Sequence, residues 1–291
     1  MGNLLFSIRT ALQTVYPFRE ANAIARIILQ EEFGLTLSDV YSGKDIQISE
    51  EQNRNLKNII ERLQNYEPLQ YVLGVADFCG LRFDVNPDVL IPRPETAELL
   101  EMIFAHFSSS PMDILDIGSG SGCIAITLSH RWPNSCVVSW DVSEKALQVA
   151  RSNNQKLGTN VRFEQHDVLQ EENGAHAKFD LIVSNPPYIK EKERKEMEAN
   201  VLNWEPELAL FVPNEDPLLF YRTIIQKSVR LLNPQGWLFF EINREHGEEI
   251  VSLLGKYGFS QIELAKDFSG NDRFIKAQFA SRLACANSSN S

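Results

Sequence analysis

The chain has 291 residues, of which 43% are hydrophobic, so it is long enough to bury a sizeable core. Acidic residues outnumber basic ones by 39 to 28, and the formal net charge of -11 argues against nucleic acid as the main partner, because binding to phosphates requires a basic surface. No apolar run reaches the ~18 residues that a membrane span requires, and no signal-peptide pattern precedes the first helix, so we expect a cytoplasmic protein with no membrane partner.

Residues 1–70 are expected to form a helical domain, because apolar side chains recur there at helical spacing. Pro17 separates the first helix from the second, and Gly34 ends the second. Ser49 and Gln52 form a capping box at the start of a later helix, and Pro68 is expected to end that helix. The apolar positions are Leu4, Leu5, Ile8, Leu12, Val15, Ala21, Ile24, Ile27, Ile28, Phe33, Leu56, Ile59, Ile60 and Leu63. No cluster of titratable groups lies on these faces, which favours packing or recognition over catalysis.

Residues 71–92 mix apolar positions with glycines such as Gly74 and Gly80, which is typical of short strands with turns. This pattern predicts a β-hairpin linker between two domains. Pro94 then marks the start of a helix that is expected to begin near Glu95.

Strands and helices are expected to alternate from about Asp113 onward, which predicts that residues 93–283 form one α/β domain built on a doubly wound, Rossmann-like parallel sheet. Strands are expected at 114–117, 137–140, 161–163, 179–184, 237–242, 262–264 and 274–279. Helices are expected over 124–131, after the capping residue Ser143, and over 217–232, where Asn233 and Pro234 close the helix. The polar tail 284–291 is expected to be disordered.

The four cysteines are Cys79, Cys123, Cys136 and Cys285. No two have the C-x-x-C spacing, and none has histidines nearby at the spacing of a zinc site. We therefore expect reduced thiols and no metal.

A glycine-rich segment, D-I-G-S-G-S-G, joins the first predicted parallel strand to its helix. Its residues are Asp116, Ile117, Gly118, Ser119, Gly120, Ser121 and Gly122. Glycines let a backbone approach a ligand closely, and the free N–H groups of the helix that follows favour an anionic group. Asp141, at the end of the second strand, is placed to accept hydrogen bonds from the hydroxyls of a ribose. The alternative is a tight strand-to-helix turn without a ligand.

The spacing of these glycines departs from the G-x-G-x-x-G pattern of dinucleotide sites and resembles the first motif of class I S-adenosylmethionine-dependent methyltransferases. That resemblance implies S-adenosylmethionine as the cofactor, held by the glycine-rich segment and by Asp141. Asp167 and Val168, after the third strand, would then hold the adenine. Asp167 is equally typical of an acid in a simple turn, and both interpretations stay open.

The segment Asn185-Pro186-Pro187-Tyr188 follows the fourth strand and resembles the N-P-P-Y motif of methyltransferases that act on nitrogens conjugated to a π-system. An amide nitrogen is planar and a poor nucleophile. The side-chain oxygen of Asn185 and the carbonyl of Pro186 can each accept one N–H, while the two prolines hold that carbonyl rigidly and Tyr188 offers a flat face. We therefore expect these four residues to bind the substrate and act in catalysis, and Asn185 also to contact the cofactor.

Further segments resemble the release factor glutamine methyltransferases, the PrmC/HemK family. They are Glu67-Pro68-Leu69-Gln70-Tyr71, Leu90-Ile91-Pro92-Arg93-Pro94-Glu95-Thr96, Glu205-Pro206 with Ala209-Leu210, and residues 267–273. The resemblance implies N5-methylation of the glutamine in the Gly-Gly-Gln motif of class I peptide chain release factors. It also implies a seven-stranded sheet with an antiparallel last strand, and an N-terminal helical bundle that recognises the factor.

Two details of this resemblance stay open. Where a glycine is expected soon after the fifth strand, the chain instead reads Glu241-Ile242-Asn243-Arg244-Glu245-His246-Gly247, and the role of the atypical segment from Asn243 to Gly247 stays open. Arg93 and Glu95 either form a salt bridge at the start of a helix or shape the cofactor pocket.

Other functions fit part of the pattern. A DNA adenine-N6 methyltransferase would share the segment from Asn185 to Tyr188, but the acidic charge and the helical N-terminus argue against it. Another protein-glutamine methyltransferase, or a non-catalytic scaffold that retains the fold, is a further alternative. We expect a monomer.

Overall fold

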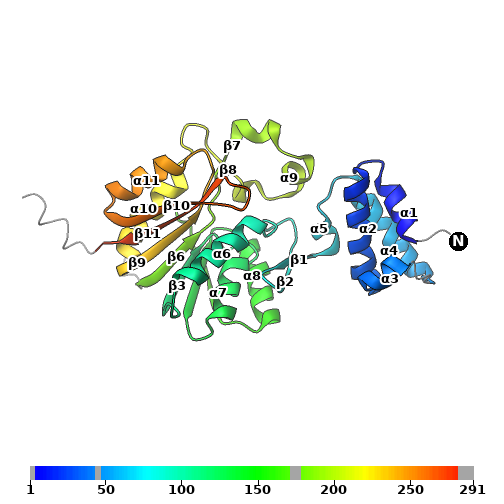
Figure 1. The fold of residues 1–291 in the computed structure, drawn as a ribbon, viewed down its shortest axis with the longest axis horizontal. Coiled ribbons are helices and arrows are strands. Elements are labelled where there is room, and N and C mark those ends of the chain that lie inside the picture. The colour runs from blue at the N-terminus through cyan, green and yellow to red at the C-terminus, as the bar shows by residue number, and fades with distance from the viewer. Residues whose placement is uncertain (1–3, 43–46, 171–177, 281–291) are drawn as a thin grey trace, which may run out of the picture. The chain divides into compact units, whose positions relative to one another are not determined.

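The computed structural model describes residues 4–42, 47–170 and 178–280, and its chain divides into two compact units (Figure 1). One unit comprises Met1–Val75 with Glu198–Trp204, and the other comprises Ala76–Met197 with Glu205–Ser291. The expectation of a disordered tail at 284–291 lies outside the described residues. In the described part of the chain, no helix combines the length and the apolar character that crossing a bilayer requires.

The first unit is helical. Its helices are α1 (Leu4–Leu12), α2 (Phe18–Phe33), α3 (Leu37–Ser42), α4 (Glu50–Gln64), α5 (Leu69–Leu73) and α9 (Ala199–Trp204). The capping box of Ser49 and Gln52 at the start of α4 is confirmed, with the Gln52 backbone nitrogen 3.1 Å from the Ser49 hydroxyl oxygen. Gly34 ends α2 in the left-handed conformation, as expected. The expectation that Pro68 ends a helix was wrong, because α4 ends at Gln64 and Pro68 is the residue that precedes α5.

A partly buried ion pair fixes the chain between α4 and α5. The Arg62 guanidinium donates to both carboxylate oxygens of Glu67, at 2.8 and 2.5 Å, and also to the carbonyls of Tyr71 and Val72. Glu67 is only 5% exposed, so this fork-shaped pairing satisfies a carboxylate that burial would otherwise destabilise. The Glu67–Tyr71 segment is therefore anchored to the end of α4.

The second unit begins with the expected hairpin, formed by β1 (Val75–Phe78) and β2 (Leu81–Asp84). A seven-stranded sheet follows, in the order β10-β11-β9-β6-β3-β4-β5. Its strands are β3 (Asp113–Ile117), β4 (Cys136–Asp141), β5 (Val161–Gln165), β6 (Phe179–Ser184), β9 (Leu232–Glu241), β10 (Phe259–Lys266) and β11 (Asp272–Phe279). β3, β4, β5, β6 and β9 are parallel, and the last strand, β11, pairs antiparallel with both β9 and β10. The α/β class and the antiparallel last strand are thus confirmed.

Helices cover both faces of this sheet (Figure 1). α6 (Pro94–His106), α7 (Cys123–Arg131) and α8 (Glu144–Leu157) supply one apolar cluster, and α10 (Leu219–Leu231) and α11 (Gly247–Lys256) supply the other. Successive side chains of a strand point to opposite faces, so Leu181 and Val183 of β6 pack in the first cluster and Ile182 packs in the second. The central strands are buried on both faces, as expected of a doubly wound sheet.

The start of β9 differs from the expectation that Asn233 and Pro234 end a helix and precede the strand. α10 ends at Leu231, and β9 already begins at Leu232. Leu232 pairs with Phe179 of β6, but Trp237 pairs with Leu181, so the β9 side of the ladder holds extra residues at this point. Such a bulge accommodates a proline, which cannot donate to a regular ladder.

The remaining described elements of this unit are short. They are β7 (Ile189–Lys190), β8 (Phe211–Val212) and 3-10 turns at Glu191–Glu196 and Glu207–Ala209. β7 and β8 pair with each other and follow the catalytic segment predicted from the sequence. Cys79, Cys123 and Cys136 are free thiols, as expected.

Two glycines in the left-handed conformation provide a test of packing around the glycine-rich loop. Gly122 has φ +83°, and a Cβ added there would lie 2.8 Å from Ile126 Cδ1, whereas Gly158 has φ +65° with nothing within 4 Å. We expect Gly158→Ala to lower the free energy of unfolding by about 1 kcal/mol, from backbone strain alone. Gly122→Ala should lower it by about 2–4 kcal/mol, because overpacking adds to that strain. Urea denaturation would measure both, and equal losses in the two variants would contradict the tight packing at Gly122.

Candidate active site

Pairing between neighbouring parallel strands brings four chain segments to one edge of the sheet. Ile117 of β3 pairs with Trp140 of β4 and with Ser184 of β6, and Ser184 pairs with Phe240 of β9. The residues that come next in each strand or just after it are Gly118, Asp141, Asn185 and Glu241. These four therefore lie at the same level, at the carboxyl ends of the strands, where open α/β sheets place their ligands.

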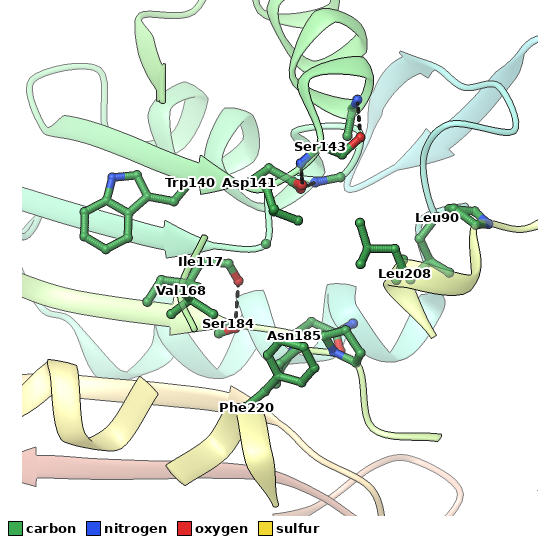
Figure 2. A pocket seen from close by; sticks show the side chains of 18 of the residues that line it. Leu90, Ile117, Trp140, Asp141, Ser143, Val168, Ser184, Asn185, Leu208 and Phe220 are labelled. Atoms are coloured by element: carbon green, nitrogen blue, oxygen red, sulfur yellow. Dashed lines mark hydrogen bonds between the residues drawn. The ribbon is translucent and has the colours of Figure 1, made fainter. Parts of the chain in front are cut away.

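A cavity that is open to solvent lies at this edge of the sheet. Figure 2 shows Asp141, Leu208 and Asn185 around it, with Trp140 and Phe220 forming parts of its apolar wall. Among the residues predicted to bind the cofactor, those that line the cavity are Gly118, Gly120, Asp141, Asp167, Val168 and Asn185. A polar edge and a broad apolar wall suit a ligand with both a charged and an aromatic part.

The glycine loop is folded against the end of β4. Gly118 N and Ser119 N both donate to the carbonyl of Trp140, at 2.8 and 3.0 Å, and Gly120 N donates to Asp141 Oδ2 at 2.9 Å. Gly118 and Gly120 have positive φ angles and line the cavity, so the backbone itself forms the wall there.

The other predicted residues of the loop are buried in its base. Asp116, Ser119, Ser121 and Gly122 are all buried. The Ser139 hydroxyl donates to Asp116 Oδ2 at 2.7 Å, and the Ser119 and Ser139 hydroxyl oxygens are 2.6 Å apart. Burial raises the pKa of Asp116 to about 8, which favours the neutral acid at pH 7. This chain of hydrogen bonds connects β3, β4 and the loop, and so fixes the loop from behind.

Asp141 is the acidic group that faces the cavity from the end of β4. Its Oδ2 accepts from Gly120 N, and its Oδ1 accepts from Ser143 N at 2.9 Å. Burial raises the pKa of Asp141, and these backbone hydrogen bonds oppose the rise. Each carboxylate oxygen can accept one more hydrogen bond. Asp141 is therefore oriented by the backbone and still able to bind two hydroxyls.

The segment after β5 places Asp167 in a turn that also borders the cavity, and contact between Asp167 and an adenine stays a prediction. Asp167 Oδ1 accepts from Leu169 N at 2.9 Å, as a turn acid does, and Asp167 also lines the cavity beside Val168. Nearby, the Trp140 ring stacks on His166 with centroids 4.2 Å apart, and Trp140 Nε1 donates to Glu164. The stacked pair gives this wall a flat aromatic surface.

The segment after β6 carries the predicted catalytic residues. Asn185, Pro186 and Pro187 line the cavity. Tyr188 packs against the apolar cluster on the α10 and α11 face, and its hydroxyl donates to Glu241 Oε1 at 3.3 Å. Burial raises the pKa of Tyr188. This packing braces the segment, and a contact between Tyr188 and the substrate stays a prediction.

Two buried side chains that the sequence did not single out lie behind Asn185. Asn185 Nδ2 donates to Thr96 Oγ1 at 3.2 Å, and the Thr96 hydroxyl donates to Glu241 Oε2 at 2.7 Å. Thr96 is 3% exposed and Glu241 is 1% exposed. Burial raises the pKa of Glu241, whereas the Thr96 hydroxyl and the charge of Arg273 stabilise its ionised form. Thr96 ends the long family-like segment before α6, which was the one signal available in the sequence.

Asn243, at the start of the atypical segment after β9, is also hydrogen-bonded to the predicted catalytic segment. Asn243 Nδ2 donates to the carbonyl of Tyr188 at 3.2 Å, and Asn243 N donates to the Tyr221 hydroxyl, also at 3.2 Å. Glu245 N donates to Asn243 Oδ1 at 3.0 Å. Asn243 therefore connects the end of β9 to the residues after β6.

Arg93 pairs with Glu205 rather than with Glu95. Arg93 Nη2 and Glu205 Oε1 are 2.6 Å apart, and Glu205 is 5% exposed. The residues after Glu205 include Pro206 and Leu208, which line the cavity. Arg93 thus forms an ion pair with the segment that leads into this wall, and a role of Arg93 in shaping the pocket stays a prediction. In the described residues, no group of three or more His, Cys, Asp and Glu side chains could hold a metal ion.

Comparisons with known proteins show what this chain is similar to. The family model "PrmC N-terminal domain" matches residues 4–74, and "Methyltransferase small domain" matches residues 95–204. A release factor glutamine methyltransferase from Bacteroides thetaiotaomicron is 47% identical over 95% of this chain and 99% of its own length. The enzyme of the same name from Flavobacterium psychrophilum is 43% identical over 92% of this chain and 95% of its own length.

A solved structure shows the same fold. The crystal structure of a methyltransferase from Pyrococcus furiosus aligns with a TM-score of 0.53, over 79% of this chain and 99% of that chain, at 18% identity. This similarity concerns the fold alone. The similarity in sequence to the curated relatives extends over nearly the whole chain. The chain therefore belongs to the release factor glutamine methyltransferase family.

Proposed function

We propose that this protein transfers a methyl group from S-adenosylmethionine to the side-chain amide nitrogen, N5, of the glutamine in the Gly-Gly-Gln motif of class I peptide chain release factors. The observation that carries the proposal is that Asn185, Pro186 and Pro187 line the same cavity as Gly118, Gly120 and Asp141. The cavity therefore contains both the acceptors proposed for the amide nitrogen, on Asn185 and Pro186, and the groups proposed to bind a nucleoside. The names of the curated relatives supply the identity of the substrate.

The polar and apolar groups that line the cavity fit S-adenosylmethionine. When bound, this cofactor would supply a methyl group on a positively charged sulfur. Asp141 retains acceptor capacity on both oxygens for the ribose hydroxyls. Asp167, Val168 and the aromatic surface beside Trp140 would hold the adenine. The N-terminus of α7, which follows the glycine loop, favours the carboxylate of the methionine part.

The catalytic residues would act by holding the reacting amide. Asn185 Oδ1 and the Pro186 carbonyl each accept one N–H of the glutamine side chain, which fixes the nitrogen and directs its lone pair into the cavity. The two prolines restrict the backbone, so the Pro186 carbonyl keeps its direction. Fixing the reactants in this way lowers the activation barrier without a strong base. The proton that the nitrogen loses leaves to solvent.

The helical unit would supply the recognition of the release factor. Phe6 and Phe18 are exposed to 56% and 55%, and the Arg9 guanidinium lies between them, 5.2 Å and 4.8 Å from their ring centroids. Aromatic rings with an arginine are the residue types that contribute most to binding in protein interfaces. We therefore assign this aromatic cluster of Phe6, Arg9 and Phe18 to binding of the factor.

The proposed function is tested directly by incubating the purified protein with a class I release factor and S-adenosylmethionine, followed by mass spectrometry of the factor. The expected result is the added mass of one methylene on the peptide that contains Gly-Gly-Gln, localised to the glutamine. A factor that stays unmodified, or methyl transfer to DNA adenine instead, would contradict the proposal.

Asp141→Ala should weaken the binding of S-adenosylmethionine by about 1.5–3 kcal/mol, because hydrogen bonds from ligand hydroxyls to a carboxylate are lost. Titration calorimetry measures the affinity, and a thermal melt establishes that the variant is folded. An unchanged affinity in the folded variant would remove Asp141 from the ribose site.

Asn185→Ala should lower kcat by at least about 100-fold, because the lost hydrogen bond acts mainly in the transition state. Binding of S-adenosylmethionine should stay within a few-fold of the wild type, which calorimetry checks. Turnover close to that of the wild type would show that another group orients the nitrogen.

The double substitution of Phe6→Ala and Phe18→Ala should lower kcat/KM for a folded release factor by about tenfold, as expected for loss of interface aromatics. The rate on a short Gly-Gly-Gln peptide should not change, because the peptide lacks the surface that the cluster binds. Ile27→Ala is the matched control, since residue 27 is an exposed apolar position on the opposite side of α2 from Phe18. Equal effects of the double substitution on factor and peptide would contradict the recognition role.

A further inference from the structure

The Asn185 side chain has two chemically different ends, and only one of them can assist the reaction. A primary amide presents an oxygen acceptor at one end and an NH2 donor at the other. The reacting glutamine nitrogen also carries two N–H groups, so it needs an acceptor. With the Asn185 amide reversed, two NH2 groups would face each other. Some part of the protein must therefore select the orientation that directs Oδ1 into the cavity shown in Figure 2.

The contacts behind Asn185 select this orientation through two hydrogen bonds in series. Thr96 has one hydroxyl hydrogen, and it is given to Glu241 Oε2 at 2.7 Å. With its hydrogen used, the Thr96 oxygen can only accept, and it accepts from Asn185 Nδ2 at 3.2 Å. An ionised carboxylate is an acceptor only, so Glu241 imposes the direction of both bonds. Asn185 Oδ1 is thereby left for the substrate.

The second oxygen of Glu241 is occupied from the same catalytic segment. Tyr188, three residues after Asn185, donates its hydroxyl to Glu241 Oε1 at 3.3 Å. Each carboxylate oxygen of Glu241 therefore accepts one hydrogen bond from a hydroxyl group. Arg273 of the neighbouring strand β11 lies close enough for its charge to stabilise the carboxylate.

We propose that Thr96 and Glu241 are positioning residues that hold the Asn185 amide with its oxygen toward the reacting nitrogen, an inference that rests on the proposed function. Neither side chain has to touch the substrate, since both are buried behind Asn185. A buried carboxylate is costly for folding, and an apolar side chain of similar size would tie α6 to β9 at least as well. A carboxylate at this position is explained by its role as an acceptor, because only an acceptor fixes the direction of the hydrogen bonds from Thr96 and Asn185.

The test compares Thr96→Val with Thr96→Ser, using the full-length protein, a folded release factor and S-adenosylmethionine. Valine keeps the branched shape but removes the acceptor and the donor, whereas serine keeps the hydroxyl. Thr96→Val should lower kcat by about 10- to 100-fold, the effect of losing a hydrogen bond connected to a charged group. The KM values for both substrates should stay within about threefold. Thr96→Ser should retain kcat within about threefold of the wild type.

Glu241→Gln provides an independent variant that keeps the size of the side chain. Its amide can donate to the Thr96 oxygen, which lets the Thr96 hydroxyl turn to Asn185 and stabilise the reversed orientation. A loss of kcat similar to that of Thr96→Val is therefore expected, with S-adenosylmethionine affinity retained by calorimetry. If either substitution prevents folding, the other still tests the proposal, and thermal melts identify which variants are folded.

A double-mutant cycle separates orientation of Asn185 from a general effect on the fold. Because Thr96 acts through Asn185, adding Thr96→Val to Asn185→Ala should reduce the residual rate no further. A full additive loss in the double variant, or wild-type kcat in folded Thr96→Val, would overturn the positioning role. Absence of methyl transfer by the wild-type protein itself would instead contradict the proposed function, and with it this inference.

Discussion

Hydrogen bonding between neighbouring parallel strands keeps Gly118, Asp141, Asn185 and Glu241 at one level of the sheet, although they come from four distant parts of the chain. A shift of one residue in any of these ladders would turn a side chain from one face of the sheet to the other. The apolar residues of β3, β6 and β9 alternate between the two cores, so burial on both faces opposes such a shift. The site therefore depends on the register of a sheet that is itself fixed by packing.

The polar groups at this edge are arranged in two layers. The layer at the cavity consists of backbone and side-chain groups that can still bind a ligand, such as Gly120 and Asp141. The layer behind it consists of fully buried groups, Asp116 under the glycine loop and Glu241 behind Asn185. Burying a carboxyl group costs stability, and each of the two accepts a hydrogen bond from the hydroxyl of a neighbouring element. The second layer gives the first its rigidity.

Much of this arrangement could be predicted from the sequence, because the signals are local. The glycine loop and the segment after Asn185 each combine a short motif with a strand end, so sequence places them at the same edge. The Thr96–Glu241 hydrogen bond joins residues 145 positions apart, and no local pattern marks it. The structure at Asn233 and Pro234 differs from the expectation for the opposite reason. Their local signal predicts a helix end and a turn, but pairing with β6 extends β9 through them with a bulge.

The central claim is that two fixed acceptors hold an uncharged amide nitrogen in the cavity. The most direct measurement is a crystal structure of the protein bound to a release factor and S-adenosylhomocysteine. We expect the glutamine side-chain nitrogen to lie within about 3.2 Å of both Asn185 Oδ1 and the Pro186 carbonyl oxygen. We also expect Asn185 Nδ2 to keep its contact with Thr96. A glutamine nitrogen bound by a different pair of groups, or facing Asn185 Nδ2, would contradict the central claim.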